Sequence, residues 1–314
     1  MAAFALFVPL VGLVLLALVA VTAVGVLTNR RVPPTPSEAA EVARRHGGTV
    51  HAIAWVAAVL LPGLVLAMLG VVTLRVSGGG DAYASVVTAT YAAVPALTFL
   101  GVHALGERTW PRPTGPVRRA ALVPRGLTAP AWLLGVTVGW GTALAITLLV
   151  CGLTADDGRR LTLGNSSASP YPGWQYGVPV ALAATCVAAA TWAVLRMIVR
   201  RPAVLDADPR YDAASRLLAS HRVLRGVQLS LALTLAAVLS FASAATSSVG
   251  LVGLALAIGV TAVAVVLASV AVALVPAAAP SIAVTAAWPA SADVPTAPAT
   301  GASDTPAPEE STHR

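Results

Sequence analysis

The 314-residue sequence contains no lysine, so all 20 of its basic residues are arginine. Retinal and pyridoxal phosphate both attach to proteins through a Schiff base on a lysine amine. The absence of lysine excludes both groups, and no other feature predicts a cofactor. The two cysteines, Cys151 and Cys186, are too few for a metal or disulfide framework.

Charge is also scarce, at 11% of residues, against about 25% in soluble domains. None of the 13 acidic residues lies within a long apolar stretch. A charge at the centre of a bilayer costs at least about 2.5 kcal/mol, so such residues occur where function needs them. Their absence argues against a carrier driven by buried carboxylates. His103 and Arg196 lie near the ends of apolar stretches, and we expect both side chains to reach the headgroups.

Seven apolar stretches dominate the sequence. A helix needs about 20 apolar residues to cross a bilayer, whereas a membrane β-barrel shows alternating segments of about ten. The stretches are continuously apolar, so we expect an all-α, polytopic integral membrane protein. Its domain is a bundle of seven transmembrane helices within residues 1–276, and an Ala/Pro/Ser/Thr-rich tail, 277–314, is expected to be disordered. The stretches are 4–27, 52–74, 82–105, 129–153, 177–199, 227–245 and 249–275.

The positions of the arginines predict the orientation of this bundle. Sixteen arginines fall in the loops after the first, third and fifth stretches, counting Arg196 at the end of the fifth, and the intervening loops hold only Arg75, Arg159 and Arg160. Arginine accumulates in short cytoplasmic loops, so the N-terminus is expected outside and the C-terminus in the cytoplasm. The residue usage is typical of a GC-rich genome, and we expect the plasma membrane of a bacterium.

Two cytoplasmic segments have helical signals of their own. Thr35 and Glu38 form a capping box, and Gly47-Gly48 predicts a stop to the short helix that follows. The segment 209–225 predicts a basic amphipathic helix leading into the sixth stretch. Its face could lie on anionic lipids of the inner leaflet or dock a cytoplasmic partner. The residues of this candidate contact are Arg210, Arg216, Leu217, Leu218, Arg222 and Arg225.

Proline interrupts two stretches near their centres. Pro62-Gly63 lies in the second stretch and Pro95 in the third. Such residues produce packing kinks that neighbouring helices tolerate, or an unwound site that binds a substrate. The sequence favours kinks and leaves both alternatives open.

Small residues at four-residue spacing predict helix contacts. Gly135 and Gly139 form a GxxxG pattern, and Gly253, Ala257 and Gly259 belong to similar spacings in the last stretch. Small residues let helix backbones approach closely. The sequence favours packing within the chain over dimerisation. Tyr171, Trp174 and Tyr176 lie just before the fifth stretch, where aromatic rings anchor helices at the headgroups or form an external surface.

Motifs for catalysis are missing: the sequence has no HExxH, no GxSxG and no nucleotide-binding pattern. We therefore expect a non-enzymatic accessory or permease-like membrane component. The alternative is a stand-alone transporter of small molecules or lipids, and an intramembrane enzyme ranks third. The expected partners are the bilayer with its anionic inner-leaflet lipids and another membrane or cytoplasmic subunit. No nucleic acid is expected.

Overall fold

Six helices make up most of the chain that the computed structural model describes, namely residues 38–75, 81–111, 129–204 and 209–275. Side chains within 62–92 and at 209–210 fall outside that description. Each helix overlaps one of the second to seventh apolar stretches, whereas the predicted helix 4–27 and tail 277–314 lie outside the described residues. The helices are α2 (Glu38–Arg75), α3 (Asp81–Arg108), α4 (Ala131–Thr154), α5 (Trp174–Arg200), α6 (Pro209–Ser248) and α7 (Val252–Leu274).

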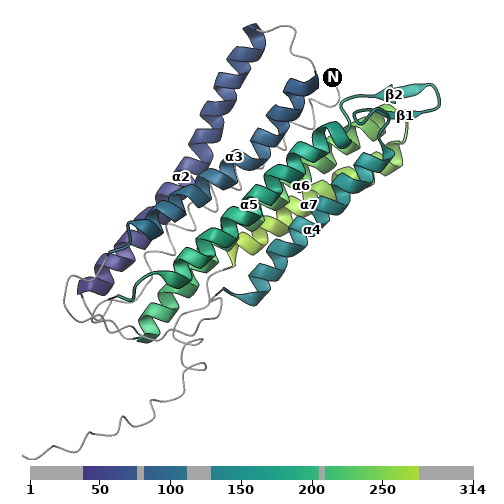
Figure 1. Ribbon diagram of the computed structural model, residues 1–314. Helices are drawn as coiled ribbons and strands as arrows, with labels where there is room; N and C mark the ends of the chain where they lie inside the picture. The colour runs from purple at the N-terminus through teal and green to yellow at the C-terminus, as the bar shows by residue number, and fades with distance from the viewer. Residues whose placement is uncertain (1–37, 76–80, 112–128, 205–208, 276–314) are drawn as a thin grey trace, which may run out of the picture.

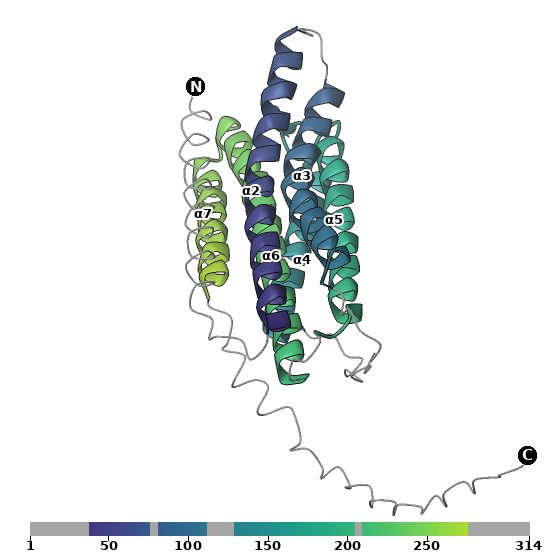
Figure 2. The same ribbon diagram turned by 90° about the vertical axis from the view of Figure 1, so that its left-hand side faces the viewer.

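The helices lie side by side in an elongated bundle (Figures 1 and 2). α6 contacts α3, α4, α5 and α7, whereas α2 packs chiefly against α3. Successive helices run in opposite directions, so the starts of α2, α4 and α6 share one end with the ends of α3, α5 and α7 (Figure 1). We call this the basic end, since Arg44, Arg108, Arg200, Arg201 and Arg225 lie there.

α2 and α6 are longer than the apolar stretches that they contain. The predicted stop at Gly47-Gly48 is wrong, because α2 continues through both glycines. A glycine inside a helix costs about 1 kcal/mol, and tertiary contacts offset this cost here. The Arg222 guanidinium, for example, donates to the Gly47 carbonyl at 3.2 Å. Similarly, 209–225 and 227–245 form one uninterrupted helix, so 209–225 follows the axis of α6.

The interior between the two ends is filled largely by apolar side chains, including Leu100, Leu133, Leu144, Val187 and Leu229. One amide lies among them. Gln228 of α6 is fully buried, accepts a hydrogen bond from Trp140 Nε1 of α4 and donates to the Ser269 carbonyl of α7, at 3.1 and 3.0 Å. Gln228 therefore links three helices, and both the oxygen and the nitrogen of its side-chain amide have a hydrogen-bond partner.

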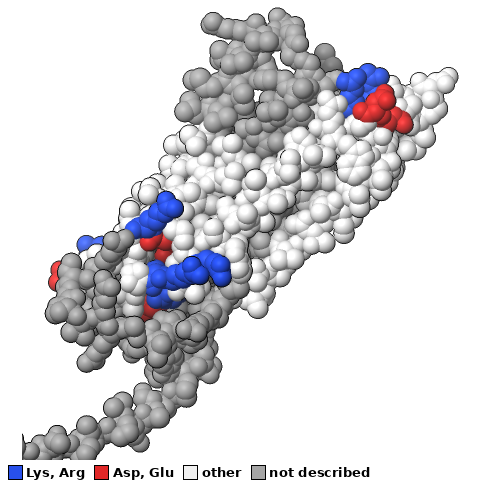
Figure 3. All heavy atoms as spheres, viewed as in Figure 1, with Lys and Arg blue, Asp and Glu red and all other residues white. Residues whose placement is uncertain are grey.

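The outer faces of α4, α5 and α7 expose large apolar side chains to the surroundings. A broad band without charge separates two charged ends (Figure 3). Within the described residues, α4, α5, α7 and residues 211–248 of α6 are long and apolar enough to cross a membrane. Such a surface is unfavourable in water, so these helices indicate a membrane-embedded protein whose described part is mainly helical. The exposed side chains include Val138, Ile146, Leu149, Leu182, Trp192, Leu256, Val260 and Leu267.

A small hairpin between α4 and α5 closes the other end of the bundle. β1 (Leu161–Leu163) pairs antiparallel with β2 (Ser166–Ala168). The two-residue turn is Gly164-Asn165, and Gly164 has a φ of 57°, which suits glycine. This Gly-Asn pair is a hairpin signal that apolar patterning does not reveal.

The aromatic residues beside the hairpin are placed differently from the sequence expectation. Tyr171 and Tyr176 are buried in the protein, so they are not membrane-interface anchors. The Tyr171 hydroxyl lies 2.7 Å from Thr154 Oγ1, which joins the loop to the end of α4. Trp174 is 45% exposed and lies over Gly152, where an added Cβ would come within 2.7 Å of its ring.

Candidate functional site

The predicted small-residue contacts separate into two groups. An added Cβ at Gly135, Gly139 or Gly253 would meet nothing within 4 Å, so these glycines make no close helix contact within the described chain. Ala257 is likewise exposed. Gly259 packs against α6, where an added Cβ would lie 3.2 Å from Ser243 Oγ. Ser243 in turn donates to the Ala255 carbonyl, so this part of α7 is in close contact with α6.

The proline positions do not interrupt their helices. α2 is helical through Pro62 and Gly63, and α3 is helical through Pro95. An unwound backbone that could bind a substrate is therefore absent at these three positions, and the kinks themselves stay a prediction.

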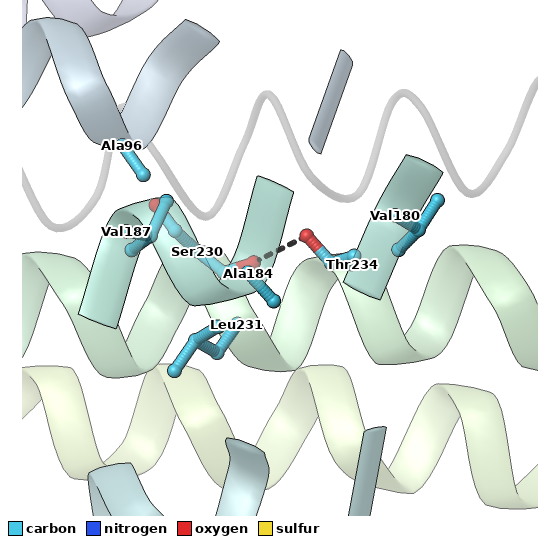
Figure 4. A pocket seen from close by; sticks show the side chains of 7 residues that line it. All are labelled: Ala96, Val180, Ala184, Val187, Ser230, Leu231 and Thr234. Atoms are coloured by element: carbon cyan, nitrogen blue, oxygen red, sulfur yellow. Dashed lines mark hydrogen bonds between the residues drawn. The ribbon is translucent and has the colours of Figure 1, made fainter. Parts of the chain in front are cut away.

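A small pocket lies between α3, α5 and α6 (Figure 4). Among its lining side chains, only Ser230 and Thr234 carry polar groups, and the Thr234 hydroxyl already donates to the Ser230 carbonyl at 2.9 Å. The pocket is thus mostly apolar and has little capacity to select a polar ligand. Its lining residues are Ala96, Val180, Ala184, Val187, Ser230, Leu231 and Thr234.

The segment 209–225, predicted as a surface helix, packs partly inside the bundle. Arg216 is only 2% exposed and pairs with Asp212 at 2.8 Å. Its guanidinium also donates to the carbonyls of Ile198, Val199 and Arg201. These carbonyls belong to the end of α5 and to the residue after it, and a helix terminus leaves such carbonyls without helical partners. Arg216 therefore caps α5 and does not face lipid.

The other residues of that candidate contact are more accessible. Leu217, Leu218, Arg222 and Arg225 are half-buried, whereas the Arg210 side chain lies outside the described residues. The predicted membrane or partner contact consequently stays a prediction for these positions.

A second buried ion pair ties α3 to the α5–α6 connection. Arg201 lies 3.6 Å from the Glu107 carboxylate, stacks over Trp110 at 3.9 Å from the ring centroid and donates to Ser215 Oγ. Burial lowers the pKa of Arg201, and the charge of Glu107 acts in the opposite direction. Because its cation and carboxylate face each other, this group is suited to holding the bundle together.

Histidines and aromatic rings form a different cluster between α2 and α3. Each helix contributes two rings one turn apart, His51 with Trp55 and Phe99 with His103. The centroids of Phe99 and His103 are 4.7 Å apart, and those of His51 and His103 are 5.7 Å apart. His103 is only 5% exposed, which contradicts the expectation that it reaches out to the headgroups.

α6 adds a third histidine and two arginines to this region. His221 is buried, and its ring lies 6.2 Å from that of Trp132 on α4. Arg222 acts electrostatically on both His51 and His103, and Arg225 acts on His51 and His221. We call His51, His103, His221, Arg222 and Arg225 the histidine–arginine cluster.

The protonation of His51 follows from its neighbour. Trp55 Nε1 donates to His51 Nε2 at 3.2 Å. An indole nitrogen can only donate, so His51 Nε2 carries no proton, and in the neutral ring Nδ1 does. His51 Nδ1 is buried without a hydrogen-bond partner, as are His103 Nε2 and His221 Nδ1.

Three unpaired ring nitrogens beside two cations favour a ligand that accepts hydrogen bonds and carries negative charge. A buried polar group without a partner costs about 1–3 kcal/mol, so these three nitrogens are available to pair with a ligand. In the described part of the chain, no three His, Cys, Asp or Glu side chains are arranged to hold a metal ion.

Sequence reasoning singled out Arg222 and Arg225 but missed the histidines as a group. The available signal was the one-turn spacing of His51 with Trp55 and of Phe99 with His103, together with His221 directly before Arg222. Those spacings place rings on one face of each helix, but the proximity of the three faces depends on the tertiary fold.

No family model, no curated protein and no solved structure matches the chain.

Proposed function

We propose that the chain is a non-enzymatic component of a bacterial plasma membrane, an accessory or permease-like subunit that works with another protein. It crosses the membrane seven times, with its N-terminus outside and its basic end in the cytoplasm. The partner is another membrane subunit or a cytoplasmic subunit.

The observation that carries this proposal is the separation of polar chemistry from the membrane interior. On the face shown in Figure 3, the charged side chains that the structure describes lie at the two ends. Between the ends the described interior is mainly apolar, and Gln228 is paired on both sides. A carrier acting alone needs polar groups that face a path at mid-membrane. The continuous helices through Pro62, Gly63 and Pro95 give no support to such a path.

The orientation rests on the described arginines. Arg44, Arg108, Arg200, Arg201 and Arg225 belong to the basic end, whereas Arg159 and Arg160 are beside the hairpin. Reporters fused after Arg45, Arg119 and Arg216 should report cytoplasm, and those after Gly79 and Ser167 should report the outside. A cytoplasmic signal from the Ser167 fusion would contradict the orientation.

The accessory role is tested by co-purification from native membranes in a mild detergent. We expect one membrane or cytoplasmic protein to co-purify in a fixed ratio, and its abundance or activity to fall when this chain is deleted. Restoring the chain should restore both. A chain that purifies alone and transports a solute in reconstituted vesicles would instead support the stand-alone transporter.

A further inference from the structure

We propose that the histidine–arginine cluster binds a phosphate group, either as the headgroup phosphate of a lipid or as a soluble phosphate. The starting observation is the His51 Nδ1–H group, a buried donor for which the described chain provides no acceptor. His103 Nε2 and His221 Nδ1 are unpaired in the same region. A ligand with several acceptor oxygens would satisfy these nitrogens, since each can be a donor.

The charge around these nitrogens favours an anion. Arg222 and Arg225 both act on His51. Arg222 donates to the Gly47 carbonyl, one turn before His51 in α2, at 3.2 Å. The donors and the positive potential therefore act in the same direction, toward a negatively charged acceptor.

The spread of the donors favours phosphate over a carboxylate. The groups come from α2, α3 and α6, and the His51 and His103 centroids are 5.7 Å apart. A carboxylate has two oxygens in one plane, whereas a phosphate presents oxygens in several directions and forms strong charge-assisted bonds with arginine.

The level of the cluster along the bundle suits a lipid phosphate. His51 directly precedes the apolar stretch 52–74, His103 lies two residues before the end of 82–105, and Arg225 lies two residues before 227–245. Basic pockets between transmembrane helices bind lipid headgroups at this depth. Only the lipid source depends on the proposed membrane spans, because soluble phosphate could bind at this end in either orientation.

The test uses the full-length protein in a neutral detergent. Dihexanoyl phosphatidylglycerol, phosphate-free dihexanoylglycerol and inorganic phosphate are titrated separately, with ionic strength held constant by chloride. Binding is measured from the rise in melting temperature and from tryptophan fluorescence, since Trp55 contacts His51 and Trp132 contacts His221. We expect saturable stabilisation by phosphatidylglycerol or by inorganic phosphate, and none by dihexanoylglycerol.

Two variants and one matched control locate the site. Arg225→Gln and His103→Gln should weaken phosphate binding about tenfold or more, the effect of losing a hydrogen bond to a charged group. Arg200→Gln removes the same charge from an exposed position at the same end and should leave the affinity unchanged.

The outcomes identify the source or overturn the proposal. Saturation by phosphatidylglycerol alone identifies a lipid headgroup, and saturation by inorganic phosphate at low concentration identifies a soluble phosphate. Equal weakening by Arg200→Gln and Arg225→Gln would show a diffuse surface effect and overturn the site. If a cluster variant does not fold, the titrations of the wild-type protein decide. Equal responses to phosphatidylglycerol and dihexanoylglycerol, with no response to inorganic phosphate, would also overturn the proposed phosphate site.

Discussion

At the scale of single residues, the side-chain amide of Gln228 is held by groups from two other helices. Replacing Gln228 with Leu leaves Trp140 Nε1 and the Ser269 carbonyl without their partner. We expect a loss of about 0.6–1.7 kcal/mol in the free energy of unfolding, the range for hydrogen bonds between membrane helices. Thermal unfolding in detergent measures it, with Gln175→Leu in the α5 first turn as control. Equal effects in both variants would show that the pairing contributes nothing specific.

Arg216 should have a larger effect, because its loss leaves a buried carboxylate. In Arg216→Met, Asp212 and three carbonyls lose the guanidinium that they share. Removing one partner of a buried pair costs about 3–5 kcal/mol, and Arg216→Met should unfold correspondingly earlier in denaturant. Adding Asp212→Leu should recover part of the loss. Arg200→Met is the exposed control, and a double variant with purely additive losses would contradict this role.

The Tyr171 hydroxyl should lose its proton at an unusually high pH. Burial raises the pKa of its hydroxyl to about 12, although the hydrogen bond with Thr154 acts in the opposite direction. The folded state favours the neutral hydroxyl. The contribution of Tyr171 to the stability of the fold is therefore complete below pH 10.0, which is the ordinary pKa of a tyrosine. It is lost as pH rises toward 12. The ultraviolet phenolate signal of wild type minus Tyr171→Phe measures this titration, and a midpoint near the ordinary value would disprove burial of the hydroxyl.

At the scale of elements, the contact of α3 with α6 depends on a missing side chain. An added Cβ at Gly226 would lie 2.4 Å from the Phe99 ring. Gly226→Ala should therefore destabilise the bundle by about 1–3 kcal/mol, as overpacking does. Gly135→Ala, which meets open space, should be neutral or stabilising by up to about 1 kcal/mol through helix propensity. Unfolding of the two variants in the same detergent compares them, and similar stabilities would contradict the close approach.

The existence of the six described helices could be predicted from apolar length, since a stretch of about 20 apolar residues is a strong signal. The residues at which these helices begin and end could not be predicted in the same way. Gly47-Gly48 looks like a stop because glycine is a poor helix former, but the Arg222 contact comes from a residue far along the chain. The same limit explains Arg216, whose carbonyl partners belong to α5. The histidine–arginine cluster could not be predicted from the sequence, because its residues come from three different helices.

At the scale of the whole molecule, the predicted tail should be dispensable for folding. Residues 277–314 have no apolar face to bury in the sequence. A chain ending at residue 276 should insert into the membrane and melt at the wild-type temperature in detergent. The full-length chain purified in parallel is the control, and a clearly lower melting temperature would show that the tail packs on the bundle.

The continuity of α6 has a mechanical consequence. Its 40 residues correspond to a rod of about 60 Å, twice the roughly 30 Å hydrocarbon thickness of a bilayer. The part before the apolar stretch is thus a lever joined rigidly to the membrane core. A force applied near Asp212 would therefore tilt all of α6 and move Gln228 with it, because the helix has no break between these two residues.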